Sequence, residues 1–113
     1  MSDSCLFCRI VRGEFPVTVI AEDAHAMAFR DIHPQAPVHI LVVPKRHVVS
    51  LAEASDAHEV GCVALLAAAV AKAEGIAESG YRTVMNTGED GGQTVGHLHM
   101  HVLGGRQMTW PPG

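Results

Sequence analysis

Residues 97–103 have the sequence His-Leu-His-Met-His-Val-Leu, and this stretch decides how the rest of the chain is interpreted. Successive side chains of a β-strand point to opposite faces, so a strand here places three imidazoles on one face. Leu98, Met100 and Val102 then point to the opposite face, where we expect a hydrophobic core. Because histidine is infrequent, its recurrence with the strand period indicates a functional site.

Two chemical uses compete for these imidazoles. Three histidines can hold a catalytic zinc ion, which commonly takes three protein ligands and one water. Alternatively, one neutral imidazole is a nucleophile, and its neighbours orient it and bind phosphate. A glycine-rich turn at residues 88–94 (Gly-Glu-Asp-Gly-Gly-Gln-Thr) immediately precedes the histidines. Such a turn can expose several backbone N–H groups to an oxyanion, which favours the phosphate-binding use.

Five segments of the chain have the composition of strands. β-branched and apolar residues, separated by segments in which Asp and Pro favour turns, predict three antiparallel strands over residues 17–22, 26–32 and 38–43. After a long helix, residues 81–86 and 95–103 alternate in the manner of two further strands.

The same chain contains two predicted helices. Residues 56–79 are rich in alanine, the best helix former, and Asp56 with Glu59 resembles a capping box. Gly80 is the expected stop. A short helix is expected over residues 5–12. The sequence therefore predicts an α+β fold, in which a five-stranded, mostly antiparallel sheet is combined with one long helix and a short N-terminal helix.

Length and charge limit the possible functions. A chain of 113 residues fits one domain, which we assign to residues 1–113. The formal net charge is −4 and the eight Lys and Arg residues are scattered, which disfavours a nucleic acid partner. The sequence has neither a membrane-spanning apolar stretch nor the pattern of an export signal. We therefore expect a cytoplasmic protein without a membrane partner.

The three cysteines suggest two different environments. In a reducing cytosol, Cys5-x-x-Cys8 is better interpreted as a metal-binding or redox-active pair than as a structural disulfide. Cys62 lies among alanines and valines, and we expect it to pack in the core as a small hydrophobic residue.

The histidine stretch matches the signature of the histidine-triad (HIT) superfamily, His-φ-His-φ-His-φ-φ, where φ is apolar. The chain resembles this superfamily over nearly its whole length, through segments that include Cys5–Cys8, Phe29–Ile32, Pro34–Pro37, Pro44–His47, Gly91–Gln93 and Gly104–Gly113. The Gly-Gly-Gln turn and the terminal segment resemble the histidine-triad nucleotide-binding protein (Hint) branch.

The resemblance implies a covalent mechanism. The middle histidine, His99, is then a nucleophile that forms a nucleotidyl-histidine intermediate, which water later hydrolyses. A backbone carbonyl such as that of His97 can fix its tautomer. By the same resemblance, His101 contacts the phosphate oxygens and Thr94 supplies a hydroxyl near the leaving group. His39 matches a histidine that orients the nucleophile, although a strand histidine with a satisfied hydrogen bond explains it equally simply.

The implied ligand is a purine nucleotide. Asp31 matches the carboxylate that binds the ribose hydroxyls. The residues that match the base pocket are Phe7, Ile10, Phe29, Ile32 and Leu41, and the rest of the expected nucleotide site comprises Asn86, Gly92, Gln93 and Val95. The expected activity is hydrolysis of purine nucleoside phosphoramidates or adenylylated compounds at the α-phosphorus, releasing a nucleoside monophosphate. The alternatives are a nucleotide-binding scaffold or sensor with little turnover, and a zinc hydrolase.

The resemblance also implies a zinc site and a dimer. Some HIT proteins bind zinc through residues that match Cys5, Cys8, His47 and His97, a closed Cys₂His₂ set typical of structural zinc. The alternative is two thiols packed near the N-terminus. Hint proteins form homodimers, and the terminal segment, residues 108–113, is expected to reach the partner with Trp110 as its anchor.

Overall fold

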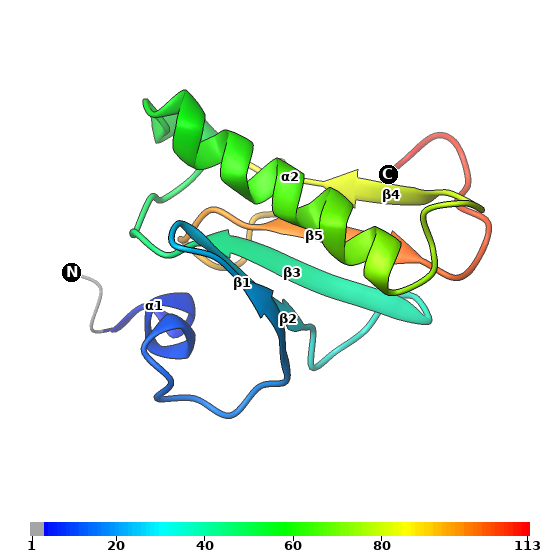
Figure 1. The fold of residues 1–113 in the computed structure, drawn as a ribbon. Coiled ribbons are helices and arrows are strands. Elements are labelled where there is room, and N and C mark those ends of the chain that lie inside the picture. The colour runs from blue at the N-terminus through cyan, green and yellow to red at the C-terminus, as the bar shows by residue number, and fades with distance from the viewer. Residues whose placement is uncertain (1–3) are drawn as a thin grey trace.

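The computed structural model describes residues 4–113, so the first three residues of the expected 1–113 domain lie outside the described residues. Within this range the elements, in chain order, are α1 (Leu6–Val11), β1 (Val19–Glu22), β2 (Ala26–Arg30), β3 (Val38–Pro44), the short 3₁₀ helix η2 (Leu51–Glu53), α2 (Ala57–Ala73), β4 (Tyr81–Val84) and β5 (Met100–Gly104) (Figure 1). The five strands form one sheet in the order β1-β2-β3-β5-β4, and each neighbouring pair is antiparallel. The predicted α+β class and its five-stranded sheet are confirmed.

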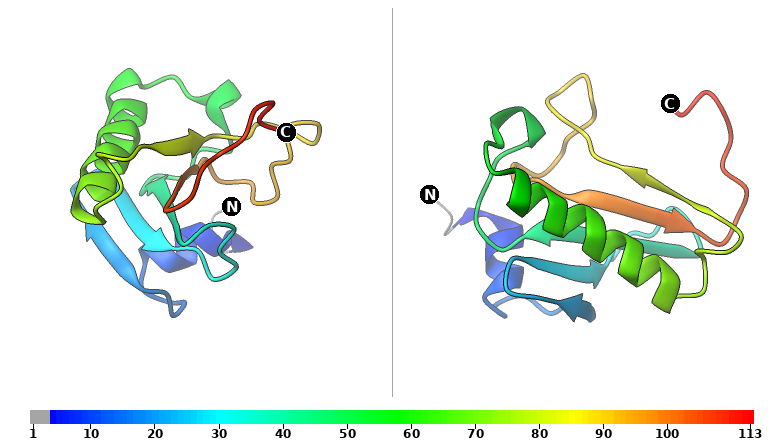
Figure 2. Two further views of the ribbon diagram at one scale, coloured as in Figure 1. Left: turned by 90° about the vertical axis from the view of Figure 1, so that its right-hand side faces the viewer. Right: turned by 45° about the horizontal axis from the view of Figure 1, so that its top comes forward.

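The sheet separates two hydrophobic layers. Along β2, Ala26 and Ala28 face the layer that contains α2, whereas Met27 and Phe29 face the layer that contains α1. The small alanine side chains allow the long helix to pack closely on its side of the sheet. Figures 1 and 2 show α2 lying along one face of the sheet, with α1 on the other. The expected functional histidines lie in the α1 layer.

The central strand β3 fixes the position of the histidines. It lies between β2 and β5, and all of its residues after Val38 are buried. Its register with β5 pairs Leu41 with His101 and His39 with Leu103. Side chains of odd-numbered residues in both strands point to the α1 face, so His39 lies diagonally across from His101.

The predicted strand over residues 95–103 is too long at its start. Pairing with β3 begins at Met100, so His97 and His99 precede the regular strand. Their alternation persists because Leu98 donates its N–H to the carbonyl of Val48 (2.7 Å) and is buried in the α2 layer. The three imidazoles therefore still occupy one side of the sheet.

The predicted helix over residues 56–79 ends early, at Ala73. Gly75 has a φ of +78°, its N–H donates to Lys72 O, and the N–H of Ile76 donates to Ala71 O, a Schellman ending. Ile76 is buried in the core, so Gly75 and not Gly80 terminates the helix. The N-terminus is as predicted, because Asp56 Oδ1 accepts from the N–H groups of the following first turn.

Two smaller expectations need correction. Glu59 does not complete a capping box, because its carboxylate forms a bidentate pair with Arg46 (2.8 and 2.9 Å). Cys62 is half-buried on α2 and lies outside both core clusters, so the predicted core packing is wrong. Within residues 4–113, every helix is too short or too polar to cross a lipid bilayer.

Candidate active site

A pocket on the α1 side of the sheet contains most of the expected nucleotide site. Its lining includes these expected residues: Phe7, Ile10, Phe29, Asp31, Ile32, Leu41, Thr94, Val95, His99 and His101. It also includes residues that the sequence pattern did not indicate: Leu6, Phe15, Val17, Arg30 and His33. Phe15 and Val17 follow α1 in a segment of irregular structure, where no periodic pattern could indicate that they face a site.

The walls of the pocket are apolar and its reactive end is polar. Phe7 from α1 packs edge-on against Phe29 of β2, with ring centroids 5.6 Å apart, and against His99 at 5.0 Å. Ile32 is 59% exposed, which is unusual for a large hydrophobic side chain and is consistent with a place at the mouth of a pocket. An aromatic or planar ligand group fits these walls.

His99 is held in one tautomer by the backbone. Its Nδ1 lies 2.8 Å from the carbonyl oxygen of His97, and its side chain is buried. Since a carbonyl only accepts, Nδ1 carries the proton and Nε2 keeps its lone pair. This hydrogen bond to the His97 carbonyl is the one expected from the sequence. In the neutral form of His99, Nε2 is therefore the nitrogen that can attack an electrophile, and the side chain lines the pocket.

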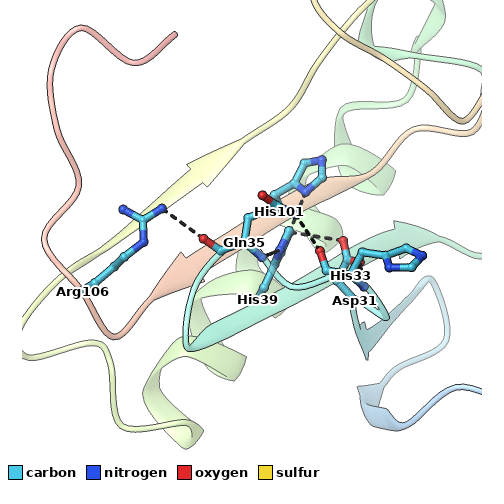
Figure 3. A network of polar contacts seen from close by, with 6 residues as sticks. All are labelled: Asp31, His33, Gln35, His39, His101 and Arg106. Carbon is cyan, nitrogen blue, oxygen red and sulfur yellow. Dashed lines mark hydrogen bonds and ion pairs between the residues drawn. The ribbon is translucent and has the colours of Figure 1, made fainter.

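A chain of hydrogen bonds orients His101 in the opposite sense (Figure 3). The backbone N–H of Gln35 donates to His39 Nδ1 (2.9 Å), so neutral His39 carries its proton on Nε2. That nitrogen lies 2.9 Å from His101 Nδ1 and 3.3 Å from Asp31 Oδ2. When His39 donates to His101 Nδ1, neutral His101 must carry its own proton on Nε2 and presents a donor.

Burial keeps these two imidazoles neutral. Desolvation, with smaller repulsion from His99 and His39, lowers the pKa of His101 to about 4. Desolvation also lowers the pKa of His39, and the nearby Asp31 carboxylate opposes this shift. A neutral His101 can donate a hydrogen bond to an anionic oxygen near pH 7.

The loop that carries Gln35 is itself held in place. Arg106, after β5, donates to the Gln35 carbonyl (3.1 Å), and the N–H of His33 donates to Asp31 Oδ1 (2.8 Å), as Figure 3 shows. Asp31, which is expected to bind ribose, thus lines the pocket and also contacts His39 through Oδ2. Its Oδ1 accepts the hydrogen bond from His33 within the same turn.

The glycine-rich turn lies next to the pocket, but several of its polar groups already form hydrogen bonds within the protein. The N–H groups of Gly92 and Gln93 donate to carbonyls within the turn. The Gln93 side chain accepts from Gly88 N and donates to the carbonyls of Val49 and Val95. Asn86, Gly92 and Gln93 lie outside the pocket lining. Their expected contact with a nucleotide stays a prediction.

The residues of the expected zinc site converge behind His99. The ligand atoms of Cys5, Cys8, His47 and His97 all lie within 4.8 Å of one another. Cys5 Sγ is 3.3 Å from His97 Nδ1, and Cys8 Sγ is 3.3 Å from His47 Nδ1. His97 Nε2 donates to the Pro44 carbonyl (2.8 Å), which leaves Nδ1 toward the thiols. Two thiols and two imidazoles grouped in this way fit a tetrahedral zinc ion.

The sequence and the fold of the chain are similar to those of known proteins. The chain is 52% identical to an uncharacterized HIT-like protein of Synechococcus elongatus, over 100% of both chains, and 50% identical to the 14 kDa zinc-binding protein of Zea mays, over 96% of this chain and 87% of that protein. The crystal structure of a HIT family hydrolase from Legionella pneumophila superposes with a TM-score of 0.94 at 50% identity, covering 97% of this chain and 100% of that one. The family model of the HIT domain matches residues 12–108, and the chain therefore belongs to the HIT domain family.

Proposed function

We propose that this protein is a hydrolase of the Hint type, which cleaves purine nucleoside phosphoramidates or adenylylated compounds at the α-phosphorus. The observation that carries the proposal is the opposed orientation of two neighbouring imidazoles. His99 offers a lone pair on Nε2 and His101 a donor on Nε2, and both line the same pocket. A nucleophile beside a donor is what attack on a phosphoryl group requires.

The proposed reaction has two displacements at phosphorus. His99 Nε2 attacks the α-phosphorus, the bond from phosphorus to the leaving amine breaks, and the amine takes a proton from solvent through the Thr94 hydroxyl. Water then attacks the nucleotidyl-histidine and gives up a proton to solvent, the bond from phosphorus to Nε2 breaks, and a nucleoside monophosphate leaves. His101 donates to a phosphoryl oxygen in both steps and stabilises the charge that develops there.

The rest of the pocket supports a nucleoside as the bound group. The aromatic and aliphatic walls suit a purine base, and Asp31 at the pocket lining suits the ribose hydroxyls. The name of the Legionella relative, a hydrolase, agrees with turnover. We expect small purine nucleotides, and not nucleic acid, as the partners of this pocket in the cytoplasm.

We also propose that Cys5, Cys8, His47 and His97 bind a structural zinc ion, as the name of the maize relative suggests for that protein. When bound, zinc would cross-link the start of α1 to the sheet. The carbonyl of His97 holds His99, so the same cross-link would fix the orientation of the nucleophile. The chemical step itself uses only the side chains of the pocket.

The decisive experiment traps the intermediate. Adenosine 5′-phosphoramidate is mixed with the protein, the reaction is quenched with base, and intact mass and peptide mapping locate the nucleotidyl adduct. We expect an adduct on His99 in the wild type. In His99→Ala both the adduct and the turnover should be lost. Binding of adenosine monophosphate to His99→Ala should stay within about tenfold of wild type, because the nucleophile matters mainly to the transition state.

Two outcomes would favour the alternatives. Tight binding of adenosine monophosphate by the wild type without turnover or adduct would indicate a scaffold or sensor. Immediate loss of all turnover on chelation, with unchanged thermal stability, would indicate a zinc hydrolase. Near-normal turnover by His99→Ala would refute the covalent mechanism.

A further inference from the structure

A second cluster of metal-ligating side chains lies outside the pocket and the Cys₂His₂ set. His25 occupies the turn between β1 and β2, and His58 and Cys62 lie four residues apart on α2, where a helix places them on one face. Their ligand atoms all lie within 4.8 Å of one another. The rings of His25 and His58 are 4.8 Å apart between centroids, and Cys62 Sγ is 3.6 Å from His58 Nε2.

The backbone on both sides of the cluster is fixed by hydrogen bonds. Asp23 Oδ1 accepts from the N–H of His25 (2.7 Å), and the His25 carbonyl accepts from the N–H of Lys45 (2.8 Å). On the helix, Asp56 Oδ1 caps the first turn and accepts from the N–H of His58 (3.0 Å). Thus three side chains from two elements are held together by structure that does not depend on a metal.

The separation of one pair of ligand atoms in the cluster, Cys62 Sγ and His58 Nε2, matches tetrahedral coordination. With zinc bonds of about 2.05 Å to nitrogen and about 2.3 Å to sulfur, tetrahedral geometry separates the two ligand atoms by about 3.6 Å. The observed separation of Cys62 Sγ and His58 Nε2 is 3.6 Å. The donors are two imidazoles and one thiol, which select Zn²⁺ and similar transition metals over Mg²⁺ or Ca²⁺.

We propose that His25, His58 and Cys62 form a second transition-metal site, which binds Zn²⁺ through three side chains and one water. Both histidines are exposed, so the fourth position is open to solvent. A bound ion would tie the β1–β2 turn to the first two turns of α2. The site is independent of the proposed hydrolase function, because it shares no residue with the pocket or with the Cys₂His₂ set.

Site-resolved alkylation tests this proposal. Metal is first removed from the full-length protein by chelation, Zn²⁺ is added back, and the rate of iodoacetamide labelling is measured at each cysteine by peptide mass spectrometry. We expect Zn²⁺ to slow labelling of Cys62 at least tenfold in the wild type. In His25→Ala and His58→Ala this protection should disappear, while protection of Cys5 and Cys8 is unchanged. The matched control is His33→Ala, which removes an exposed histidine outside the cluster. In this variant Zn²⁺ should protect Cys62 as it does in the wild type.

A zinc count provides the second readout. By elemental analysis after buffer exchange, the wild type should retain one Zn²⁺ more per chain than His25→Ala, His58→Ala or Cys62→Ser, at equal far-ultraviolet circular dichroism. Protection of Cys62 should also be the same after a hundredfold dilution of the protein. Three results would each overturn an intrachain site. They are a labelling rate of Cys62 that does not change with Zn²⁺, equal zinc counts in the wild type and all variants, and protection of Cys62 that is lost on dilution.

Discussion

At the scale of single residues, the chemistry of this site depends on which nitrogen of each imidazole holds a proton. Carbonyl oxygens define the protonated nitrogen of His97 and His99, and the N–H of Gln35 defines it for His39. The sequence shows the histidines and their spacing. It also suggests the His97 carbonyl as the partner of His99, but it cannot show Gln35 and Pro44, because these two residues approach the triad only through the strand pairing of β3 with β5.

A first prediction concerns the pH dependence of stability. The pKa of His101 is lowered to about 4 in the folded protein, so below pH 6.5 the unfolded chain binds the proton that the folded chain excludes. This contribution to the free energy of unfolding is fully present well above pH 6.5 and is lost as the pH falls toward 4, by about 3 kcal/mol for a pKa that moves from 6.5 to about 4. Urea denaturation at several pH values gives the free energy of unfolding as a function of pH. Between pH 6.5 and 4 this free energy should fall less steeply with decreasing pH for His101→Asn than for the wild type. Equal slopes in the two proteins would contradict the prediction.

A second prediction concerns the role of His101 in binding. Its proposed hydrogen bond is made to the phosphate in the ground state and in the transition state, so His101→Ala should weaken monophosphate binding and slow turnover. We expect a loss of roughly tenfold in binding, as for one charge-assisted hydrogen bond. Calorimetric titration and steady-state kinetics measure the two effects separately. An unchanged rate would remove His101 from the site.

At the scale of elements, the sequence predicts which elements exist better than where they end. The alanine-rich composition and Asp56 give the start of α2 correctly. Gly75 and Gly80 are both plausible stops, and both have positive φ. The choice between them depends on Ile76, whose burial against the sheet requires the chain to turn there. That is a tertiary contact, which local composition does not contain.

The helix ending gives a third prediction. Gly75 has a φ of +78°, which is costly for a residue with a Cβ, although a Cβ there would meet nothing within 4 Å. Gly75→Ala should therefore lower the free energy of unfolding by about 1 kcal/mol. The matched control is Gly61→Ala within α2, which also meets nothing within 4 Å and has an ordinary helical φ. It should raise stability by roughly 0.5 to 1 kcal/mol. Similar effects of the two substitutions in urea denaturation would refute the argument.

The N-terminal helix gives a fourth prediction, about zinc. α1 has only six residues, and the expected zinc would hold it through Cys5 and Cys8. Because a short helix is marginal without tertiary support, chelation should lower the melting temperature before it lowers activity. Thermal melts and turnover measured along one chelator titration give the order of the two losses. Cys8→Ser should melt at the temperature of the chelated wild type. Because this variant already lacks the Cys₂His₂ site, chelation should not lower its melting temperature further through that site.

At the scale of the whole molecule, the single chain leaves large apolar side chains exposed. Trp110 is 81% exposed and Leu65 on α2 is 74% exposed. The tail that carries Trp110 is nevertheless ordered against β4. Arg82 donates to the carbonyl of Thr109 (2.8 Å) and lies 5.9 Å from the centre of the indole ring. An ordered segment that presents an indole to solvent favours a partner surface over a frayed end.

We therefore propose that the chain forms a homodimer and that residues 108–113 reach the partner, as the resemblance to Hint proteins implies. The fifth prediction is that light scattering at micromolar concentration gives twice the 12.0 kDa mass of one chain. Trp110→Ala should weaken the dimer, because burial of an indole is among the largest single contributions at an interface. Arg82→Gln keeps the indole but loosens the tail, and should have a smaller effect.

Removal of residues 108–113 should also change the ratio of kcat/KM values for phosphoramidates with small and bulky leaving amines, because the tail is expected near the partner's pocket. A mass of one chain at these concentrations would refute the dimer, and an unchanged ratio would refute the role of the tail in selecting the substrate.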